Sequence, residues 1–300
     1  MTFRKRKELS GHSSAIYSLA FDQTFIYTAS ADKFVARWNA ETGIQDKFAI
    51  RFESPVYTLC LLDNDKKLAV GLANGDLHVF DLDSKQELKF FKQHPSALFA
   101  LIENPVQGQL YAGDADGNLS VWRVDTNELL LILPLMCGKI RRIAISPSGD
   151  FIALACQDGT YRVFDTQTFN EIETVQAHKG GTTALLFDPN DESILYTGGK
   201  DAWLRSWKWK NGSIVNEVPA HNYVIYDIIC LNSRKTLITA SRDKTVKVWN
   251  KGRLSFLQRL DQKGGGHRHS VNCLIVYADN SFVTASDDKR IILFEKLDDA

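Results

Sequence analysis

The sequence predicts an all-β fold built from seven copies of one repeating unit. Segments 26–38, 237–249 and 282–294 share a pattern in which Asp stands six residues before an aromatic residue. Short apolar runs rich in Val, Ile, Thr, Phe and Tyr alternate with turn signals, which is typical of strands and not of helices. We therefore expect four short antiparallel strands per unit and almost no helix.

The seven units are evenly spaced along the chain. Successive aromatic residues are separated by 42, 42, 42, 43, 42 and 45 residues, so seven units occupy nearly all of the 300 residues. We expect residues 1–300 to form a single domain. The acidic or amide residues and their aromatic partners are Asp32 and Trp38, Asn74 and Phe80, Asp116 and Trp122, Asp158 and Phe164, Asp201 and Trp207, Asp243 and Trp249, and Asp288 and Phe294.

Turn signals and histidines mark the boundaries inside each unit. Turns are predicted in order at Asp22-Gln23, Asn74-Gly75, Pro147-Ser148-Gly149, Asp158-Gly159 and Asn211-Gly212. A histidine stands 26 to 29 residues before the aromatic residue in five units, and Phe52 and Met136 occupy this position in units two and four. Because one repeated position explains five histidines, they do not indicate a metal or catalytic set. These five are His12, His94, His178, His221 and His267.

In these residues the sequence resembles the WD-repeat β-propeller family. The resemblance implies a seven-bladed propeller in which His, Ser or Thr, Asp and Trp form a structural tetrad within a blade. The matching sets are His12, Ser30, Asp32 and Trp38; His221, Ser241, Asp243 and Trp249; and His267, Ser286 and Asp288, followed by Phe294. No unit contains a literal Trp-Asp pair, and units two and four lack the histidine.

The tetrad has a physical rationale as a buried chain of hydrogen bonds. Asp accepts from the imidazole, which is linked through a hydroxyl to the indole N–H, and each charge-assisted bond contributes about 1.5–3 kcal/mol. Unit three differs, because Asp114 takes the serine position beside Asp116 and His94. Two carboxylates around one imidazole would raise a carboxyl pKa or keep the histidine protonated, which leaves a metal or catalytic site there as an alternative.

The ring is expected to close through the N-terminal segment. The chain provides only three strands for unit seven after His267, and residues 3–9 occupy the place before Gly11-His12 that outer strands hold in other units. We therefore expect residues 3–9 to complete blade seven. The basic run 4–7 then protects an outer sheet edge, with nuclear import or phosphate binding as alternatives.

The candidate binding site is the mouth of the central channel. Five residues after the histidine position, four of the seven units have an aromatic residue. The positions four and seven residues after the histidine position are nearly all apolar, so two buried positions are three residues apart. This spacing breaks strand alternation and predicts a bulge that turns the side chain between them toward the mouth. The seven residues are Tyr17, Tyr57, Phe99, Arg141, Thr183, Tyr226 and Asn272.

The residue before the tetrad Asp adds a second set to the mouth. The resemblance implies that both positions bind peptides. Alanines in units one to three are expected to leave space beside the aromatic residues, while Lys200, Arg242 and Arg141 make the opposite arc basic. This combination suits an extended peptide with an apolar or cationic anchor and acidic or phosphorylated groups. Alternatively, the aromatic residues only plug the channel. The second set is Ala31, Ala73, Ala115, Gln157, Lys200, Arg242 and Asp287.

Composition restricts the classes of function. Lys and Arg (36) balance Asp and Glu (36), which disfavours a general nucleic-acid coat. Five cysteines without a C-x-x-C pair fit neither a disulfide framework nor a zinc site and indicate a reducing compartment. Residues 1–9 lack the apolar stretch of a signal peptide, and the longest apolar run is far too short to span a membrane. We expect a cytoplasmic protein, with a nuclear location also open.

The leading functional hypothesis is a non-enzymatic interaction scaffold that needs no metal or cofactor. One rival is a propeller enzyme with a metal near His94, Asp114 and Asp116. Another is nucleic-acid binding, with the tyrosines as stacking surfaces and Arg141, Arg142, Lys200 and Arg242 as phosphate contacts. We expect a monomer unless the apolar segment 129–135 mediates a dimer. The run 264–266 lacks the context of a phosphate loop and is interpreted as a linker.

Overall fold

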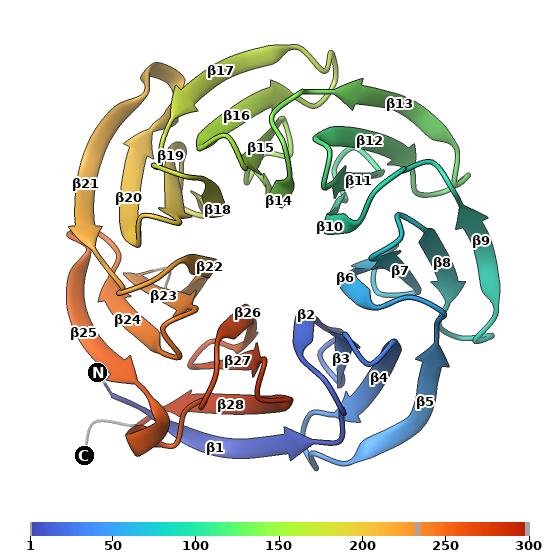
Figure 1. The fold of residues 1–300 in the computed structure, drawn as a ribbon, viewed down its shortest axis with the longest axis horizontal. Helices are drawn as coiled ribbons and strands as arrows, with labels where there is room; N and C mark the ends of the chain where they lie inside the picture. The colour runs from blue at the N-terminus through green and yellow to red at the C-terminus, as the bar shows by residue number, and fades with distance from the viewer. Residues whose placement is uncertain (1, 232–234, 298–300) are drawn as a thin grey trace.

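A computed structural model describes residues 2–231 and 235–297, which form seven four-stranded antiparallel sheets. The sheets stand radially around a central channel, as the blades of a propeller (Figure 1). The innermost strands of the blades surround this channel, and they are β2, β6, β10, β14, β18, β22 and β26. The predicted all-β, seven-bladed architecture is confirmed.

The first four blades follow the chain from inside to outside. Blade one comprises β2 (Ile16–Phe21), β3 (Phe25–Ser30), β4 (Phe34–Asn39) and β5 (Gln45–Arg51). Blade two comprises β6 (Val56–Leu62), β7 (Lys67–Leu72), β8 (Leu77–Asp81) and β9 (Glu87–Phe91). Blade three comprises β10 (Leu98–Asn104), β11 (Gln109–Asp114), β12 (Asn118–Arg123) and β13 (Leu129–Pro134). Blade four comprises β14 (Ile140–Ile145), β15 (Phe151–Cys156), β16 (Thr160–Asp165) and β17 (Glu171–Gln176).

The last three blades complete the ring, with two short 3₁₀ helices between strands. Blade five comprises β18 (Thr182–Asp188), β19 (Asp191–Gly199), β20 (Trp203–Lys208), η1 (Trp209–Asn211) and β21 (Ser213–Pro219). Blade six comprises β22 (Ile225–Leu231), β23 (Thr236–Ser241), β24 (Val246–Asn250) and β25 (Ser255–Leu260). After η2 (Gln262–Gly264), blade seven comprises β26 (Val271–Ala278), β27 (Ser281–Ser286), β28 (Arg290–Lys296) and β1 (Phe3–Ser10).

The N-terminal strand closes the ring as expected. Strand β1 pairs antiparallel with β28 from Phe3 opposite Lys296 to Ser10 opposite Arg290, and Figure 1 shows it at the outer edge of blade seven. Phe3 and Leu9 are buried, and the Phe3 ring meets Phe282 edge to face at 5.3 Å. The pairing therefore adds apolar burial as well as hydrogen bonds to the last blade.

The core lies between neighbouring blades. Middle strands are buried on both faces, and every residue of β23 and β27 is buried. Apolar clusters join each blade to the next, so that Trp38 of blade one packs with Leu293 of blade seven. The ring is thus held by side chains that face one another across the gaps between sheets.

Every innermost strand contains the predicted bulge. The register against the second strand shifts at the same repeat position in all seven blades, for example between Ile16 and Ser18, and between Val56 and Thr58. The bulged residues are Tyr17, Tyr57, Phe99, Arg141, Thr183, Tyr226 and Asn272. The backbone thus has the irregularity that the spacing of three required.

The apolar segment 129–135 forms the outer strand of blade three. Its side chains alternate, with Leu131 and Leu133 packed against the core and Leu130 and Ile132 each 38% exposed. Only one face of the segment is therefore open to solvent.

Candidate partner-binding site at the channel mouth

The buried tetrads that support the mouth use a threonine and not the predicted serine. The His12 ring nitrogens lie 2.8 Å from Asp32 Oδ2 and 2.6 Å from Thr28 Oγ1, and the Trp38 indole donates to Thr28 at 3.1 Å. Blade six repeats this arrangement through Thr239, and in blade seven His267 contacts Thr284. The assignment of Ser30, Ser241 and Ser286 to the tetrads is therefore wrong.

Strand register explains the difference. Thr28 lies opposite Ala36 and shares its face with Trp38, whereas Ser30 is two residues farther along the strand, about 7 Å away. Ser30 Oγ instead accepts the Asp32 backbone N–H at 3.1 Å and shapes the turn. Ser241 and Ser286 make the same contact with Asp243 and Asp288.

Blade three has a rearranged tetrad and not a pair of carboxylates around one imidazole. His94 bonds to Asp114 at 2.8 Å and to Ser120 at 2.7 Å, and the Trp122 indole donates to Ser120. Burial raises the pKa of Asp114, but hydrogen bonds from His94 and Asn118 outweigh it and lower the pKa overall. Asp116 is exposed. No group of three metal-binding side chains occurs within residues 2–231 and 235–297.

Blades two and four replace the histidine differently. Phe52 is buried and packs edge to face on Phe80 at a centroid distance of 6.0 Å. Met136 does not fill the interior position, since its side chain is 87% exposed and the following residue, Cys137, is buried instead. A positive φ of 54° at Met136 turns its side chain outward.

The tetrads should make stability depend on pH. Burial lowers the pKa of His178 and His221, while hydrogen bonds from the histidines overcome burial and lower the pKa of Asp201 and Asp243. Groups with lowered folded pKa values stabilise the fold above their unfolded pKa and lose this contribution as pH falls. We expect the melting temperature to decrease below about pH 6.5, by about 5 °C or more at pH 4.

Thermal unfolding followed by circular dichroism at several pH values measures this effect. Asp227 opposes the trend, because burial raises its pKa above the ordinary value. A melting temperature that rises between pH 7 and pH 4 would contradict the prediction.

Three aromatic side chains form one side of the mouth. The rings of Tyr17 and Tyr57 meet edge to face at 5.2 Å, and Tyr57 lies 5.1 Å from Phe99 at an angle of 30°. Burial raises the pKa of Tyr17, and the nearby Asp287 and Tyr57 raise it further. The alanines of units one to three were expected to leave space beside these rings, and in the structure the rings also contact one another.

Cations lie against this aromatic side. The Arg141 guanidinium is 5.3 Å from the ring centroids of both Phe99 and Tyr226, and Lys139 Nζ is 4.0 Å from that of Phe99. Burial lowers the pKa of Arg141, and the nearby tyrosines act in the opposite direction. Lys139 was not predicted, because it precedes the innermost strand and belongs to neither repeated position that defined the site.

Two cavities open between these groups. The first, of about 280 Å³, is lined by the aromatic residues with Lys139, Arg141, Arg142 and Asn272. The second, of about 400 Å³, lies on the cationic side, where Lys200 and Arg242 are exposed and Tyr226 forms part of the wall. The predicted aromatic and cationic residues therefore lie around adjoining cavities.

Two polar positions of the mouth are occupied internally. Asn272 donates to Asp287 Oδ1 at 2.8 Å and to the Ile16 carbonyl at 2.9 Å, which links blade seven to blade one. Thr183 is buried and donates to the carbonyl of Ile225. Asp287 consequently orients Asn272 and lies outside the two cavities.

An ion pair between the buried Asp227 and the partly exposed Arg142 crosses the channel below the mouth. Arg142 of blade four lies 2.9 Å from Asp227 of blade six, and Asp227 also accepts the backbone N–H groups of Ile228 and Leu274. Arg142 lines both the mouth and the deeper channel. It therefore pairs with Asp227 inside the ring while it also lines the mouth.

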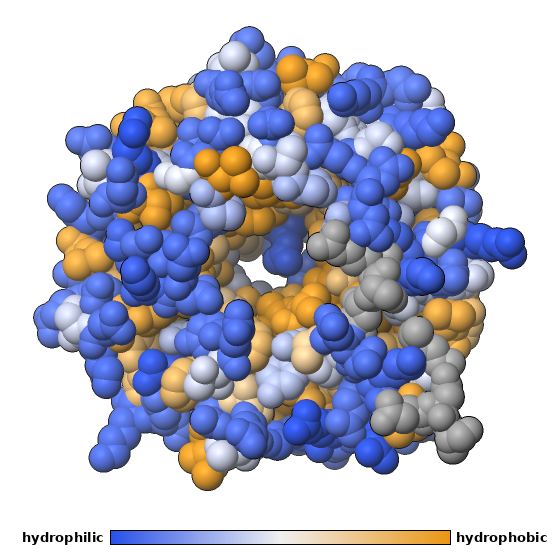
Figure 2. All heavy atoms as spheres, turned by 180° about the vertical axis from the view of Figure 1, so that it is seen from behind, coloured by the Kyte–Doolittle hydropathy of each residue, from blue (hydrophilic) through white to orange (hydrophobic). Residues whose placement is uncertain are grey.

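The deeper channel is mainly apolar. Leu61, Ile102, Ile145, Leu186 and Ile229 line it, and in the view from behind hydrophobic side chains border the central opening above and below (Figure 2). Polar and aromatic groups thus concentrate at the mouth, with an apolar passage behind them.

Within the described part of the chain, no helix has the length and apolar character needed to cross a membrane.

Comparison with known proteins agrees with this architecture. A family profile described as "WD domain, G-beta repeat" matches residues 3–39, 212–250 and 258–295. Another, described as "Anaphase-promoting complex subunit 4 WD40 domain", matches residues 110–190. Both descriptions concern WD repeats, and the matches extend over both halves of the ring.

Similar individual proteins cover much of the chain at low identity. A guanine nucleotide-binding protein subunit beta from Zea mays is 23% identical over 216 residues, which are 67% of this chain and 56% of that protein. Pre-mRNA-processing factor 17 from Homo sapiens is 22% identical over 254 residues, 80% of this chain and 43% of that protein. The U3 small nucleolar RNA-associated protein 15 homolog from Gallus gallus is 23% identical over 207 residues, 67% and 38%.

The chain thus spans only about half the length of these relatives. Seven four-stranded blades, the His-Thr-Asp network within them and the matching family profiles agree with one another. The chain belongs to the WD-repeat β-propeller family.

Proposed function

We propose that the protein is a non-enzymatic interaction platform that binds an extended peptide segment of a protein partner at the channel mouth. The observation that supports this most is the cavity lined by aromatic rings, in contact with one another, and by cations. Aromatic and arginine side chains in partly enclosed pockets dominate the energy of protein recognition. The relatives are named as a subunit, a processing factor and an RNA-associated protein, and such names favour membership of assemblies.

The chemistry of the mouth indicates the kind of peptide. Lys200 and Arg242 are exposed beside the second cavity and can pair with acidic or phosphorylated side chains. The ring faces of Tyr17 and Tyr57 offer contacts to an apolar or cationic anchor. We therefore expect a peptide with an anchor at one end and negative charge at the other, bound by a protein that works in the cytoplasm or nucleus.

Replacing Tyr57 and Phe99 together by Ala tests the proposal. Each side chain is partly exposed at the mouth, so the variant should keep its fold and melt within a few degrees of the wild type. Loss of two anchors should weaken peptide binding by about 100-fold. Binding of a fluorescent library of acidic and phosphorylated peptides, followed by anisotropy, measures the effect.

Phe256→Ala is the matched control, because Phe256 is a 55% exposed aromatic residue on the outer strand β25. It should leave peptide binding unchanged. A fall of more than about 10 °C in the melting temperature of the mouth variant, with peptide binding intact, would show that the rings only plug the channel.

Nucleic-acid binding is the second candidate, and the basic arc of Lys139, Arg141, Lys200 and Arg242 favours it. Phosphate contacts would make binding of a single-stranded oligonucleotide fall steeply with salt. At physiological salt, a peptide-binding protein should bind the acidic or phosphorylated peptides, whereas a nucleic-acid-binding protein should bind the oligonucleotide.

A further inference from the structure

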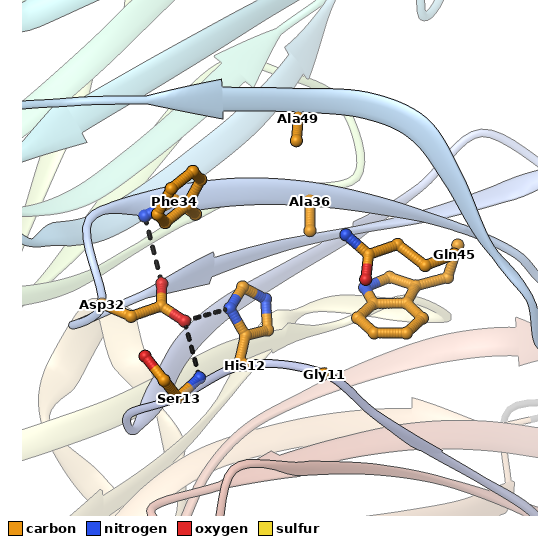
Figure 3. A pocket seen from close by; sticks show the side chains of 9 residues that line it. Gly11, His12, Ser13, Asp32, Phe34, Ala36, Gln45 and Ala49 are labelled. Carbon is orange, nitrogen blue, oxygen red and sulfur yellow. Dashed lines mark hydrogen bonds and ion pairs between the residues drawn. The ribbon is translucent and has the colours of Figure 1, made fainter.

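Blade one contains a pocket that its counterparts in other blades fill with their own side chains. Its volume is about 250 Å³, and Figure 3 shows it between β4 and β5, beside the His12 and Asp32 pair. Ala36 and Ala49 lie opposite each other in the strand pairing and present only methyl groups to the space between Phe34 and Gln45. The pocket shares no residue with the channel mouth.

Blades five and six have a cation at the position of Ala36, four residues after the tetrad Asp. In blade five Arg205 donates to Asp201 at 2.9 Å and to the Ala177 carbonyl at 3.1 Å. In blade six Lys247 donates to the Ala220 carbonyl at 2.6 Å. Both carbonyls belong to the residue before the tetrad histidine, and Gly11 is the equivalent residue in blade one.

Blades four and seven also have an arginine that binds both the acidic residue and a backbone carbonyl. Arg162 of blade four donates to Asp158 at 2.9 Å and to the Leu135 carbonyl at 3.0 Å. In blade seven Arg290 comes from a different strand position, yet it donates to Asp288 and to the Gly266 carbonyl. Four of the seven blades therefore place a basic side chain over this end of the sheet.

Blade one keeps the acceptors of this arrangement but has no cation of its own. Asp201 accepts hydrogen bonds from His178, Lys179, Trp203 and Arg205. In blade one, Asp32 accepts the equivalent hydrogen bonds from His12, Ser13 and Phe34. Among the residues that the structure describes, no cation takes the place of Arg205 beside it. A carboxylate has about four acceptor sites, so one remains on Asp32.

The aromatic wall is also retained. In blade five the Arg205 guanidinium lies 5.2 Å from the ring centroid of Trp203, two residues after the tetrad Asp. Phe34 occupies this position in blade one and is 37% exposed at the edge of the pocket. A cation in the pocket would thus meet a carboxylate and an aromatic face, both of which attract guanidinium groups.

We propose that this pocket of blade one receives an arginine side chain from a partner protein, which takes the place that Arg205 holds within blade five. The guanidinium donates to Asp32, lies over Phe34 and extends its apolar stem between Ala36 and Ala49. The inference does not depend on peptide binding at the channel mouth, because the two sites have no residue in common.

Titration of the full chain with N-acetyl-argininamide tests the site. In NMR spectra, the indole N–H resonance of Trp38 and the backbone amide resonances of Trp38 and Phe34 should shift as the probe is added, until the site is saturated. The uncharged isostere N-acetyl-citrullinamide should bind at least about tenfold more weakly. An equal response to both probes, or no saturable shift with the arginine probe, would overturn the proposal.

Two variants separate the pocket from general effects of charge. Ala36→Arg supplies the cation from within the chain, as in blade five, and should reduce probe binding by about tenfold or more. Phe34→Ala removes a partly exposed ring without disturbing the core and should weaken binding several-fold, which keeps the test valid if the first variant does not fold. Undiminished binding in both variants would contradict the site.

Arg51 provides the matched control, since it lies opposite Phe34 in the strand pairing and could reach the pocket from within. Arg51→Ala should leave the affinity for the arginine probe unchanged. Binding that appears only in Arg51→Ala would show that the chain fills its own pocket, and the proposal would be wrong.

Discussion

Deletion of residues 2–10 is expected to unfold the ring or to leave it aggregated at 37 °C. The deletion removes the outer strand of blade seven, exposes the edge of β28 and takes Phe3 and Leu9 out of the core. Burial of two such side chains alone contributes about 3–6 kcal/mol, which is a large part of the stability of an ordinary domain. Circular dichroism and light scattering during heating measure the loss.

A peptide of residues 2–12 added in trans should restore part of the lost stability, because β1 makes an ordinary antiparallel pairing with β28. The control is Arg6→Ala, which changes an exposed residue of the same strand. If the truncated chain melts within a few degrees of the intact protein, closure by the N-terminal strand contributes little.

Asp227→Ala is expected to cost about 2–3 kcal/mol of unfolding free energy. The change leaves the Arg142 guanidinium without its partner across the channel and the Leu274 amide without its acceptor. The buried N–H groups of Ile228 and Leu274 lose their acceptor, and each such loss costs about 1–3 kcal/mol, whereas the 39% exposed Arg142 side chain stays in contact with solvent. Denaturation in urea, monitored by tryptophan fluorescence, gives the value.

Asp227→Asn serves as the comparison, since an amide oxygen can still accept one backbone N–H. It should cost less than the alanine variant but more than a surface substitution. Loss of less than about 1 kcal/mol for Asp227→Ala would show that the ion pair is not a structural link across the ring.

The sequence predicted the ring because its evidence is repeated seven times. The bulge at Tyr17 and its equivalents followed from a spacing of three that regular strands cannot accommodate. The tetrad hydroxyl was misassigned because Thr28 and Ser30 are both hydroxyl residues on one face, and only the pairing with β4 separates them. The repeat positions were therefore enough to predict the bulge and the presence of a tetrad, whereas the strand register was needed to identify the hydroxyl residue of the tetrad.

The parts of the site that escaped prediction depend on distances across the ring. Arg142 and Asp227 share one repeat position in blades two apart, and only the closed channel brings them to 2.9 Å. The blade-one pocket exists because Ala36 and Ala49 have small side chains, and a search for motifs of functional residue types does not detect small side chains. Comparing Ala36 with Arg205 and Lys247 would have indicated it in the sequence.

The shared final blade also determines when the proposed binding surface is complete. Tyr17 lies in blade one, and Asn272 reaches it from blade seven through the Ile16 carbonyl. During synthesis on the ribosome, the first blade must wait beside an open gap until β28 has emerged and can pair with β1. A growing polypeptide therefore has an incomplete channel mouth, and the proposed docking surface is complete only after translation has passed β28.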